Sequence, residues 1–178
     1  MTEPIHRFPE FWTEADLDAL PENGHRYEIL HGGMHLSPPR NGRHQRTGQR
    51  LVLRLLSAAP EGWEVLQDLG IRVPGGIYVP DAVVLKPNAD LDATWQDTEN
   101  VALVVEVASP TTDLRDRTDK AAKYAEAGIP TYWRVARDGT ITVHALVDEA
   151  QYGIVKPGET WTAVLPFSVE LDPAALVV

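Results

Sequence analysis

The sequence predicts a single α/β domain over residues 1–178, built on a mixed sheet that helices flank. Its 178 residues fit one domain of ordinary size, at about 100–200 residues per domain. The run at 101–108 is almost entirely Val, Leu and Ala, which is typical of a central strand covered on both faces. A clear helical pattern follows at 113–127. Strands and helices mixed in this way indicate a core sheet with helices packed against it and antiparallel strands added.

The first part of the chain shows a helix start and a hairpin. Thr13 and Asp16 form a capping-box pattern, which opens a helix by satisfying the N–H groups of its first turn. Two strand-like runs flank the sequence His-Gly-Gly at 31–33, which is typical of a tight turn. These patterns predict, in order, a short helix from residue 13, strands at 26–30 and 34–37, and a long helix at 42–59.

The remaining elements are mostly strands. Runs rich in Val, Ile and Leu are separated by turns such as Pro-Gly-Gly at 74–76, and Gly128 and Pro130 end the clearest helix. An acidic stretch at 90–99 is most simply a solvated loop. The expected order is strands at 64–68, 71–73, 79–85 and 101–108, a helix at 113–127, a hairpin of 131–135 and 141–146, and two short strands within 152–169.

Composition and charge exclude several classes of protein. The chain contains 16 Lys and Arg against 26 Asp and Glu, a formal charge of −10. This charge argues against a protein that coats nucleic acid through bulk electrostatics, although it leaves room for a local basic groove. The absence of cysteine excludes disulfides and thiolate metal sites. Because no apolar stretch approaches the ~18 residues of a membrane span and no secretion signal is recognisable, we expect a cytoplasmic protein without a membrane partner.

Two carboxylates lie in the most strand-like segments. Asp81 follows Pro80 at the start of 79–85, and Glu106 lies near the end of the apolar run. A carboxylate there is costly to desolvate, so a partner should compensate its charge. A salt bridge or hydrogen bond at a strand end would do so. The alternative is a divalent metal site with carboxylates from two neighbouring strands, because Mg²⁺ prefers oxygen ligands.

The helix after Glu106 carries three polar residues on one face. Asp116, Lys120 and Tyr124 are spaced by four residues, so their side chains lie along one side of the helix. On spacing alone, an exposed ion pair between Asp116 and Lys120 is the simpler interpretation.

The helix at 42–59 has a basic face. At about 100° per residue its four arginines cluster, which indicates either a solvated stripe or a footprint for nucleic-acid phosphates. His44 falls on the apolar side, where a histidine is usually a core residue. In the first strand, Glu28 points to one face while its two neighbours point to the other. The arginine stripe consists of Arg43, Arg46, Arg50 and Arg54.

These features occur in an order that is known from one family. The runs PDAVVL at 80–85 and VVEVASPTTDLRDRTDKAAKYAEAGIPTYWRV at 104–135 follow LPENGHRYEILHGGMHLSPP at 20–39. Together they closely resemble the Uma-type restriction endonuclease family, a branch of the PD-(D/E)xK nucleases. The resemblance covers about residues 11–136, and the pattern EVxSPxT…D…K…Y…G…YW is quite specific. It implies a restriction-endonuclease-like core and phosphodiesterase chemistry that depends on Mg²⁺ or Mn²⁺.

The resemblance also implies roles for particular residues. Asp81 and Glu106 match the motif carboxylates that hold the metal, and Glu28 matches the glutamate that completes its shell. The lysine of the written motif would fall at Ala108, so its role passes to Lys120 in the next helix. The expected supporting residues are Glu28, His44, Asp116 and Tyr124. The chain departs from the family pattern at His31, Gly33 and Ala136, none of which is an expected ligand.

The resemblance therefore favours a metal-dependent endonuclease that hydrolyses phosphodiester bonds in DNA, with a homodimer expected by analogy with nucleases that cut both strands. The competing interpretation is a catalytically retired nuclease-like fold that binds nucleic acid or supports an assembly. The charge of −10 and the lack of a separate DNA-reading domain favour this alternative mildly. The intact Asp81, Glu106 and Lys120 argue against it.

Overall fold

A computed structural model describes residues 9–21, 23–109, 113–145 and 151–177, apart from the side chains of 113–118 and 151–152. Its helices are α1 (Glu14–Asp18), α2 (Gly42–Ala58), the 3-10 helix η1 (Thr98–Asn100), α3 (Asp113–Glu126) and α4 (Pro173–Val177). Its strands are β1 (Arg26–Leu30), β2 (Gly33–Ser37), β3 (Glu64–Gln67), β4 (Gly70–Val73), β5 (Gly76–Tyr78), β6 (Ala82–Leu85), β7 (Trp95–Asp97), β8 (Val101–Val107), β9 (Thr131–Val135), β10 (Ile141–Ala145), β11 (Gln151–Val155), β12 (Trp161–Ala163) and β13 (Val169–Leu171).

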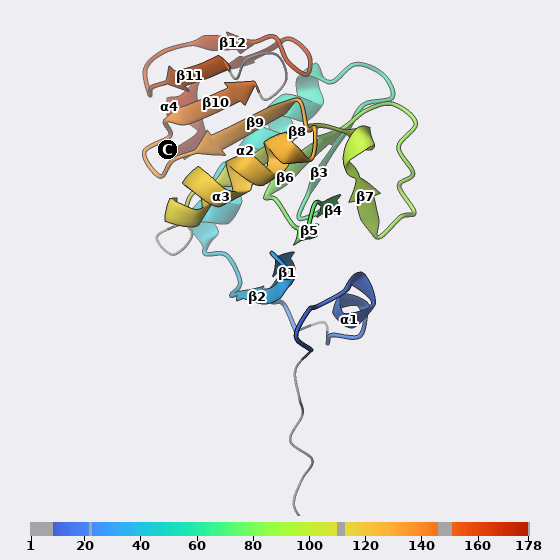
Figure 1. The fold of residues 1–178 in the computed structure, drawn as a ribbon. Coiled ribbons are helices and arrows are strands. Elements are labelled where there is room, and N and C mark those ends of the chain that lie inside the picture. The colour runs from blue at the N-terminus through green and yellow to red at the C-terminus, as the bar shows by residue number, and fades with distance from the viewer. Residues whose placement is uncertain (1–8, 22, 110–112, 146–150, 178) are drawn as a thin grey trace, which may run out of the picture.

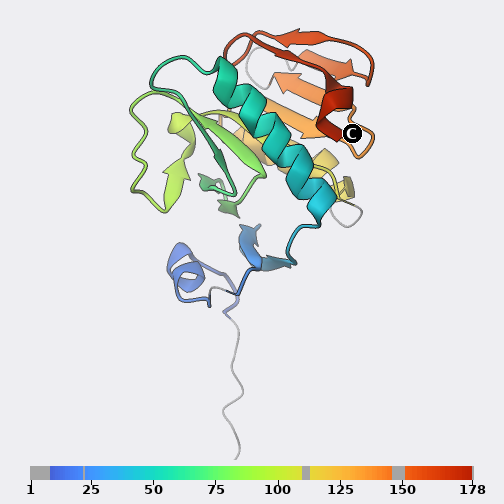
Figure 2. The ribbon, with the colours of Figure 1, turned by 180° about the vertical axis from the view of Figure 1, so that it is seen from behind.

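The larger sheet has six strands in the order β11-β10-β9-β8-β6-β3. Strands β8 and β9 are parallel, and the other neighbours are antiparallel. All seven residues of β8 are buried, as expected for a central strand covered on both faces. Helix α3 covers one face (Figure 1) and α2 crosses the other (Figure 2).

Alternation along the central strands divides the core into two layers. In β8, Leu103, Val105 and Val107 pack with Leu51 and Leu55 of α2. On the other face, Val104 packs with Tyr124 of α3. Because side chains alternate along a strand, Glu106 shares the face of Val104 and points toward α3.

The smaller sheet has five strands in the order β2-β1-β5-β4-β7. Strands β1 and β5 approach so closely that a Cβ on Gly76 would overlap the carbonyl oxygen of Ile29. Only residues 79–81 separate β5 from β6, so the chain passes directly from the small sheet into the large one. This crossing brings β1 close to the ends of β6 and β8.

The structure confirms the predicted fold class, both long helices and the central strand. The prediction of one continuous strand at 79–85 is wrong, because β5 ends at Tyr78 and β6 begins at Ala82. Pro80, which has no N–H to donate to a neighbouring strand, lies between them. The acidic stretch is not entirely a loop either. It contains β7, whose Trp95 covers Gly70 so closely that a Cβ there would overlap the ring. No helix in the described ranges is long and apolar enough to cross a membrane.

Candidate active site

A cluster of buried charged side chains lies where the two sheets meet. Its residues come from β1, the segment before α2, α2 itself, the crossing at 79–81, the end of β8, and α3. We call it the charged cluster; it consists of Arg26, Glu28, Arg40, His44, Asp81, Glu106, Lys120 and Tyr124. The segments that carry them are far apart in the sequence and meet through the sheet topology and the packing of α2 and α3 on the larger sheet.

One half of the charged cluster is centred on Lys120. Its Nζ donates to Oε1 of Glu106 at 2.7 Å and to Oε1 of Glu28 at 3.0 Å. The Tyr124 hydroxyl donates to the same Glu106 oxygen at 2.8 Å. All four side chains are buried, with Lys120 only 3% exposed. The interpretation of Lys120 as part of an exposed ion pair is therefore wrong.

The local sequence explains this arrangement. Lys120 and Tyr124 are one helical turn apart, so both reach the same face of the sheet from α3. Glu28 points inward because β1 alternates, and its Oε1 also accepts the N–H of Val79 at 3.0 Å. The side chain of Asp116 lies outside the described residues, so its predicted supporting role stays a prediction.

The other half is centred on Asp81. Its Oδ1 accepts from Arg40 at 2.7 Å and from Arg26 at 3.0 Å. Its Oδ2 accepts the N–H of Val107 at 2.7 Å and lies 3.2 Å from Nε2 of His44. Asp81 directly precedes β6, and Glu106 lies in β8, with which β6 pairs, so the two motif carboxylates belong to neighbouring strands, as predicted.

His44 connects the Asp81 carboxylate to the end of β8. The same Nε2 that contacts Asp81 lies 2.9 Å from the carbonyl oxygen of Val107. Asn41 caps α2 by accepting the His44 N–H, which fixes the first turn of the helix at this place. His44 is therefore a buried residue of the polar site, and the prediction of an inward-pointing histidine is correct.

Sequence reasoning missed two arginines. Arg26 lies between the carboxylates, 3.0 Å from Asp81 and 4.0 Å from Glu28. Its place two residues before Glu28 in the same strand could have indicated a shared face. Arg40 lies in the irregular segment before α2, where no periodicity predicts the direction of a side chain.

The mutual pairing shifts several pKa values. Burial raises the pKa of Glu28, but the charges of Lys120 and Arg26 outweigh it and lower the pKa below its usual 4.5. Burial likewise raises the pKa of Asp81, while hydrogen bonding to His44 and the charge of Arg26 bring it below 3.8. For His44, burial lowers the pKa, but the bond to Asp81 raises it above 6.5 overall. The carboxylates are thus held ionised by cations of the same chain.

The donor chemistry of this site suits a hard divalent ion. Carboxylate oxygens of Asp81 and Glu106 and the carbonyl oxygen of Val107 are the ligand types that Mg²⁺ and Mn²⁺ bind. The described residues nevertheless contain no group of three His, Asp or Glu side chains already arranged around a common ion position. Arg26 and Arg40 donate to Oδ1 of Asp81, so an ion at that oxygen would compete with these contacts.

Cavities lie beside both halves of the charged cluster. One of about 240 Å³ is lined by polar groups that include Arg40, His44 and Asp81. The other, of about 320 Å³, lies beside Lys120 and is lined also by Tyr78 and His35. The two halves of the cluster therefore each have a cavity next to them.

The arginine stripe contacts the C-terminal segment of the same chain. Arg46 donates to the carbonyl oxygen of Val177, Arg50 to that of Ala175 and Arg54 to that of Glu170, over 3.1–3.4 Å. These bonds hold α4 and β13 beside α2. The interpretation of the stripe as merely solvated is therefore incomplete for these three residues. Binding of nucleic-acid phosphates by the stripe stays a prediction.

Comparison with known proteins identifies the fold and the family. The structure of a protein described as a "putative nuclease belonging to DUF820", from Anabaena variabilis, superposes with a TM-score of 0.74. It is 18% identical and covers 92% of this chain and 98% of its own, so it shows a shared fold. A search of curated proteins finds no match. The sequence model of the Uma2 family, described as "Putative restriction endonuclease", matches residues 14–174. Since that match spans most of the chain and confirms the resemblance in its sequence, this protein belongs to the Uma2 family.

Proposed function

We propose that the protein is a metal-dependent endonuclease that hydrolyses phosphodiester bonds in DNA. Family membership and the shared fold support a nuclease. The observation that carries the proposal is the buried ammonium of Lys120 on Glu106, beside the ionised Asp81. A buried lysine between carboxylates is costly in a purely structural role, because well-packed apolar residues usually stabilise a core as well or better.

The metal would be held by Asp81 and Glu106, with Glu28 and the carbonyl oxygen of Val107 near them. A bound Mg²⁺ or Mn²⁺ polarises a phosphoryl oxygen and lowers the pKa of its water. Lys120 orients Glu106 and supplies positive charge where negative charge develops on the phosphate. Tyr124 keeps its proton, because burial and the charge of Glu106 raise its pKa, and its hydroxyl fixes the same carboxylate.

DNA as the substrate is supported by the basic surface of α2. A guanidinium that donates one bond to a backbone carbonyl keeps its charge, so the arginine stripe can still meet phosphates. Arg43 is exposed and is the cleanest probe, since the other three contact the C-terminal segment. Removing it by Arg43→Ala should flatten the log–log salt dependence of duplex binding by ~0.9, and an unchanged slope would refute the footprint.

We also expect the active form to be a homodimer, by analogy with nucleases that cut both strands of a duplex. Light scattering of the purified protein tests this point directly. A strictly monomeric protein would leave nicking of one strand as the expected reaction.

One observation favours a second candidate, the catalytically retired module. Every carboxylate of the charged cluster has a cationic partner from the same chain, so the site needs no ion to neutralise it. A fold kept only for binding nucleic acid or a partner would have this property. The two candidates differ in whether the site takes up a divalent ion.

Titration calorimetry with Mn²⁺ separates them. We expect the wild-type protein to bind the ion and Glu106→Gln to bind it at least about tenfold more weakly, since a charged ligand is replaced by a neutral one. Glu61→Gln, at an exposed carboxylate away from the cluster, is the matched control and should bind like the wild type. No heat of binding in a folded wild-type protein would favour the retired module.

A further inference from the structure

We infer that Arg40 is a phosphate-binding residue that Asp81 holds until a divalent ion takes its place. The inference rests on the proposed function and assigns a role to a residue that the sequence motif does not contain. It makes the ion pair between Arg40 and Asp81 an exchangeable contact, and the released guanidinium a ligand for the DNA backbone.

Arg40 and Arg26 share one oxygen of Asp81 but are held differently. Arg26 lies 3.0 Å from Asp81, 3.8 Å from Asp68 and 4.0 Å from Glu28, and the charge of Glu106 also raises its pKa. Among the described residues, the polar contact of Arg40 is the bond of 2.7 Å from its Nη2 to Asp81. Arg40 is therefore the cation that leaves at the smaller cost.

The backbone around each arginine supports the same conclusion. Arg26 belongs to β1, which pairs with both β2 and β5 and cannot shift alone. Arg40 lies in the irregular segment between β2 and α2, after two prolines. A side chain on such a segment can change its direction without breaking a strand ladder.

The space around Arg40 suits a phosphate. Its side chain is 15% exposed and lines the cavity of about 240 Å³ that also contains His44 and Asp81. It lines a second cavity, of about 440 Å³, together with His25 and Arg26. A guanidinium released from Asp81 stays between these cavities, and its planar fork matches the oxygens of a phosphodiester.

The competing explanation is that the salt bridge between Arg40 and Asp81 is fixed and holds the segment before α2 in place. The two explanations predict opposite changes in ion affinity when Arg40 is removed. If the ion and Arg40 compete for the same oxygen, the ion binds only the fraction of molecules in which Arg40 has left, so removing Arg40 must tighten ion binding. If Arg40 merely holds the site in shape, removing it must loosen the ligands and weaken ion binding.

Calorimetry with Mn²⁺ in the absence of DNA measures whether the affinity for the ion rises or falls. Arg40→Gln keeps the first carbons of the side chain and an N–H donor but loses the charge and the end of the guanidinium, and we expect it to bind Mn²⁺ ~10-fold more tightly than the wild type. Arg40→Lys keeps a cation on Asp81 and should stay close to the wild type. Arg137→Ala is the matched control, because it removes an exposed positive charge near His44 and Val107, and should change the affinity less than about twofold.

A second measurement follows the released guanidinium. Binding of a phosphorothioate DNA duplex, which resists hydrolysis, should be ~10-fold weaker for Arg40→Gln than for the wild type when Mn²⁺ is present. In EDTA the two proteins should bind the duplex almost equally, because Arg40 is then held by Asp81.

The outcomes separate this inference from the proposed function. Tighter Mn²⁺ binding by Arg40→Gln supports the exchange, even if the wild type binds too weakly to measure. Equal or weaker binding by Arg40→Gln overturns the exchange and leaves the metal site standing. Absence of binding by both proteins overturns the exchange and the proposed function together.

Discussion

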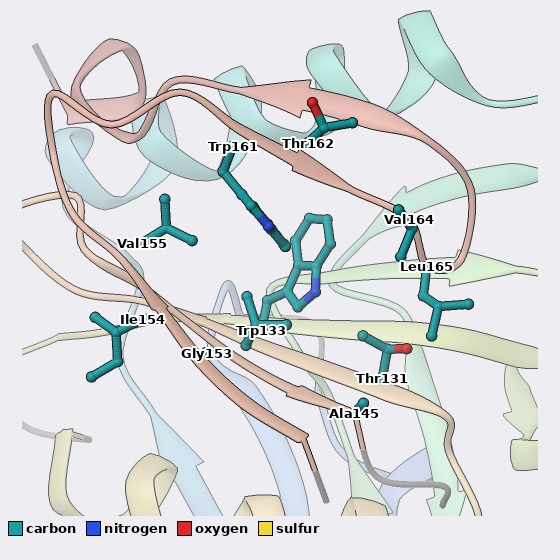
Figure 3. Close-up of a pocket in the computed structure, with 11 residues that line it drawn as sticks. Thr131, Trp133, Ala145, Gly153, Ile154, Val155, Trp161, Thr162, Val164 and Leu165 are labelled. Atoms are coloured by element: carbon teal, nitrogen blue, oxygen red, sulfur yellow. The ribbon is translucent and has the colours of Figure 1, made fainter.

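The two faces of the six-stranded sheet bury very different side chains. Toward α3, the sheet carries Glu106 within the charged cluster, where each buried charge has a partner. Toward α2 and the C-terminal strands, it carries Trp133, packed edge to face on Trp161 with ring centroids 5.2 Å apart. Neighbouring strands β8 and β9 thus place one side chain in a polar site and another in an apolar core. Figure 3 shows the apolar side, with both indole rings beside the exposed Val164 and Leu165.

The comparison shows where each face tolerates change. The apolar face has a cavity of about 350 Å³ and two buried polar atoms, Oγ1 of Thr131 and Nε1 of Trp133, with no hydrogen-bond partner among the described residues. In the charged cluster each carboxylate instead has a cationic partner, and removing Lys120 takes away the ammonium that Glu28 and Glu106 share. We therefore expect polar-to-apolar changes to be harmful on one face and harmless on the other.

The largest effect should come from Lys120→Met. It leaves Glu28 and Glu106 buried without their shared ammonium, which costs about 3–5 kcal/mol of unfolding free energy for a broken buried pair. The matched control is Lys123→Met, which breaks the more exposed pair with Glu126 and should cost less than about 1 kcal/mol. Urea unfolding of both variants measures the difference. Equal losses would mean that the cluster is far better solvated than the structure indicates.

A smaller effect concerns acid stability and Glu28. Its pKa in the folded protein is below the usual 4.5, so its ionised form stabilises the fold above that pH and the contribution is lost as the pH falls through the folded pKa. Glu28→Gln cannot titrate, so its stability should fall less steeply on acidification than that of the wild type. Urea unfolding between pH 3 and pH 7, with Glu61→Gln as the control, tests this. If the unfolding free energies of Glu28→Gln and the wild type decrease equally as the pH falls, the lowered pKa of Glu28 is contradicted.

The smallest expected effect is a gain in stability, from a substitution on the apolar face. Thr131→Val replaces a buried hydroxyl that lacks a partner with a methyl group of similar shape, in a strand that favours β-branched residues. We expect a gain of about 1 kcal/mol in unfolding free energy. Thr47→Val is the matched comparison, because its hydroxyl bonds the carbonyl of Arg43, and it should give no such gain. A clear loss for Thr131→Val would show that its hydroxyl has a partner in solution.

The sequence predicted the parts of the site that depend on local pattern. Strand β8 could be recognised from its apolar composition, and Glu106 from its place near the strand end. Lys120 and Tyr124 follow from helical spacing once the family resemblance is accepted. The interior position of Lys120 could not be predicted from spacing, because it depends on which face of α3 packs on the sheet.

What the sequence did not predict depends on contacts across the fold. The meeting of Glu28 with Lys120 was implied only by the family resemblance, because it requires β1 to pair with β5 and the chain to cross at 79–81 into the larger sheet. The contact of Arg40 with Asp81 involves an irregular segment and has no periodic signal. The bond from Arg46 to α4 could not be predicted, because the C-terminal segment has little recognisable pattern.

Cleavage of supercoiled plasmid DNA is the most direct test of the central claim that the charged cluster is a metal-dependent nuclease site. The wild-type protein and Lys123→Met should nick or linearise the plasmid with Mn²⁺ and leave it intact in EDTA. A folded Lys120→Met should leave it intact in both conditions. Wild-type protein that is folded but inactive with Mn²⁺ and with Mg²⁺, or Lys120→Met as active as the wild type, would contradict the account.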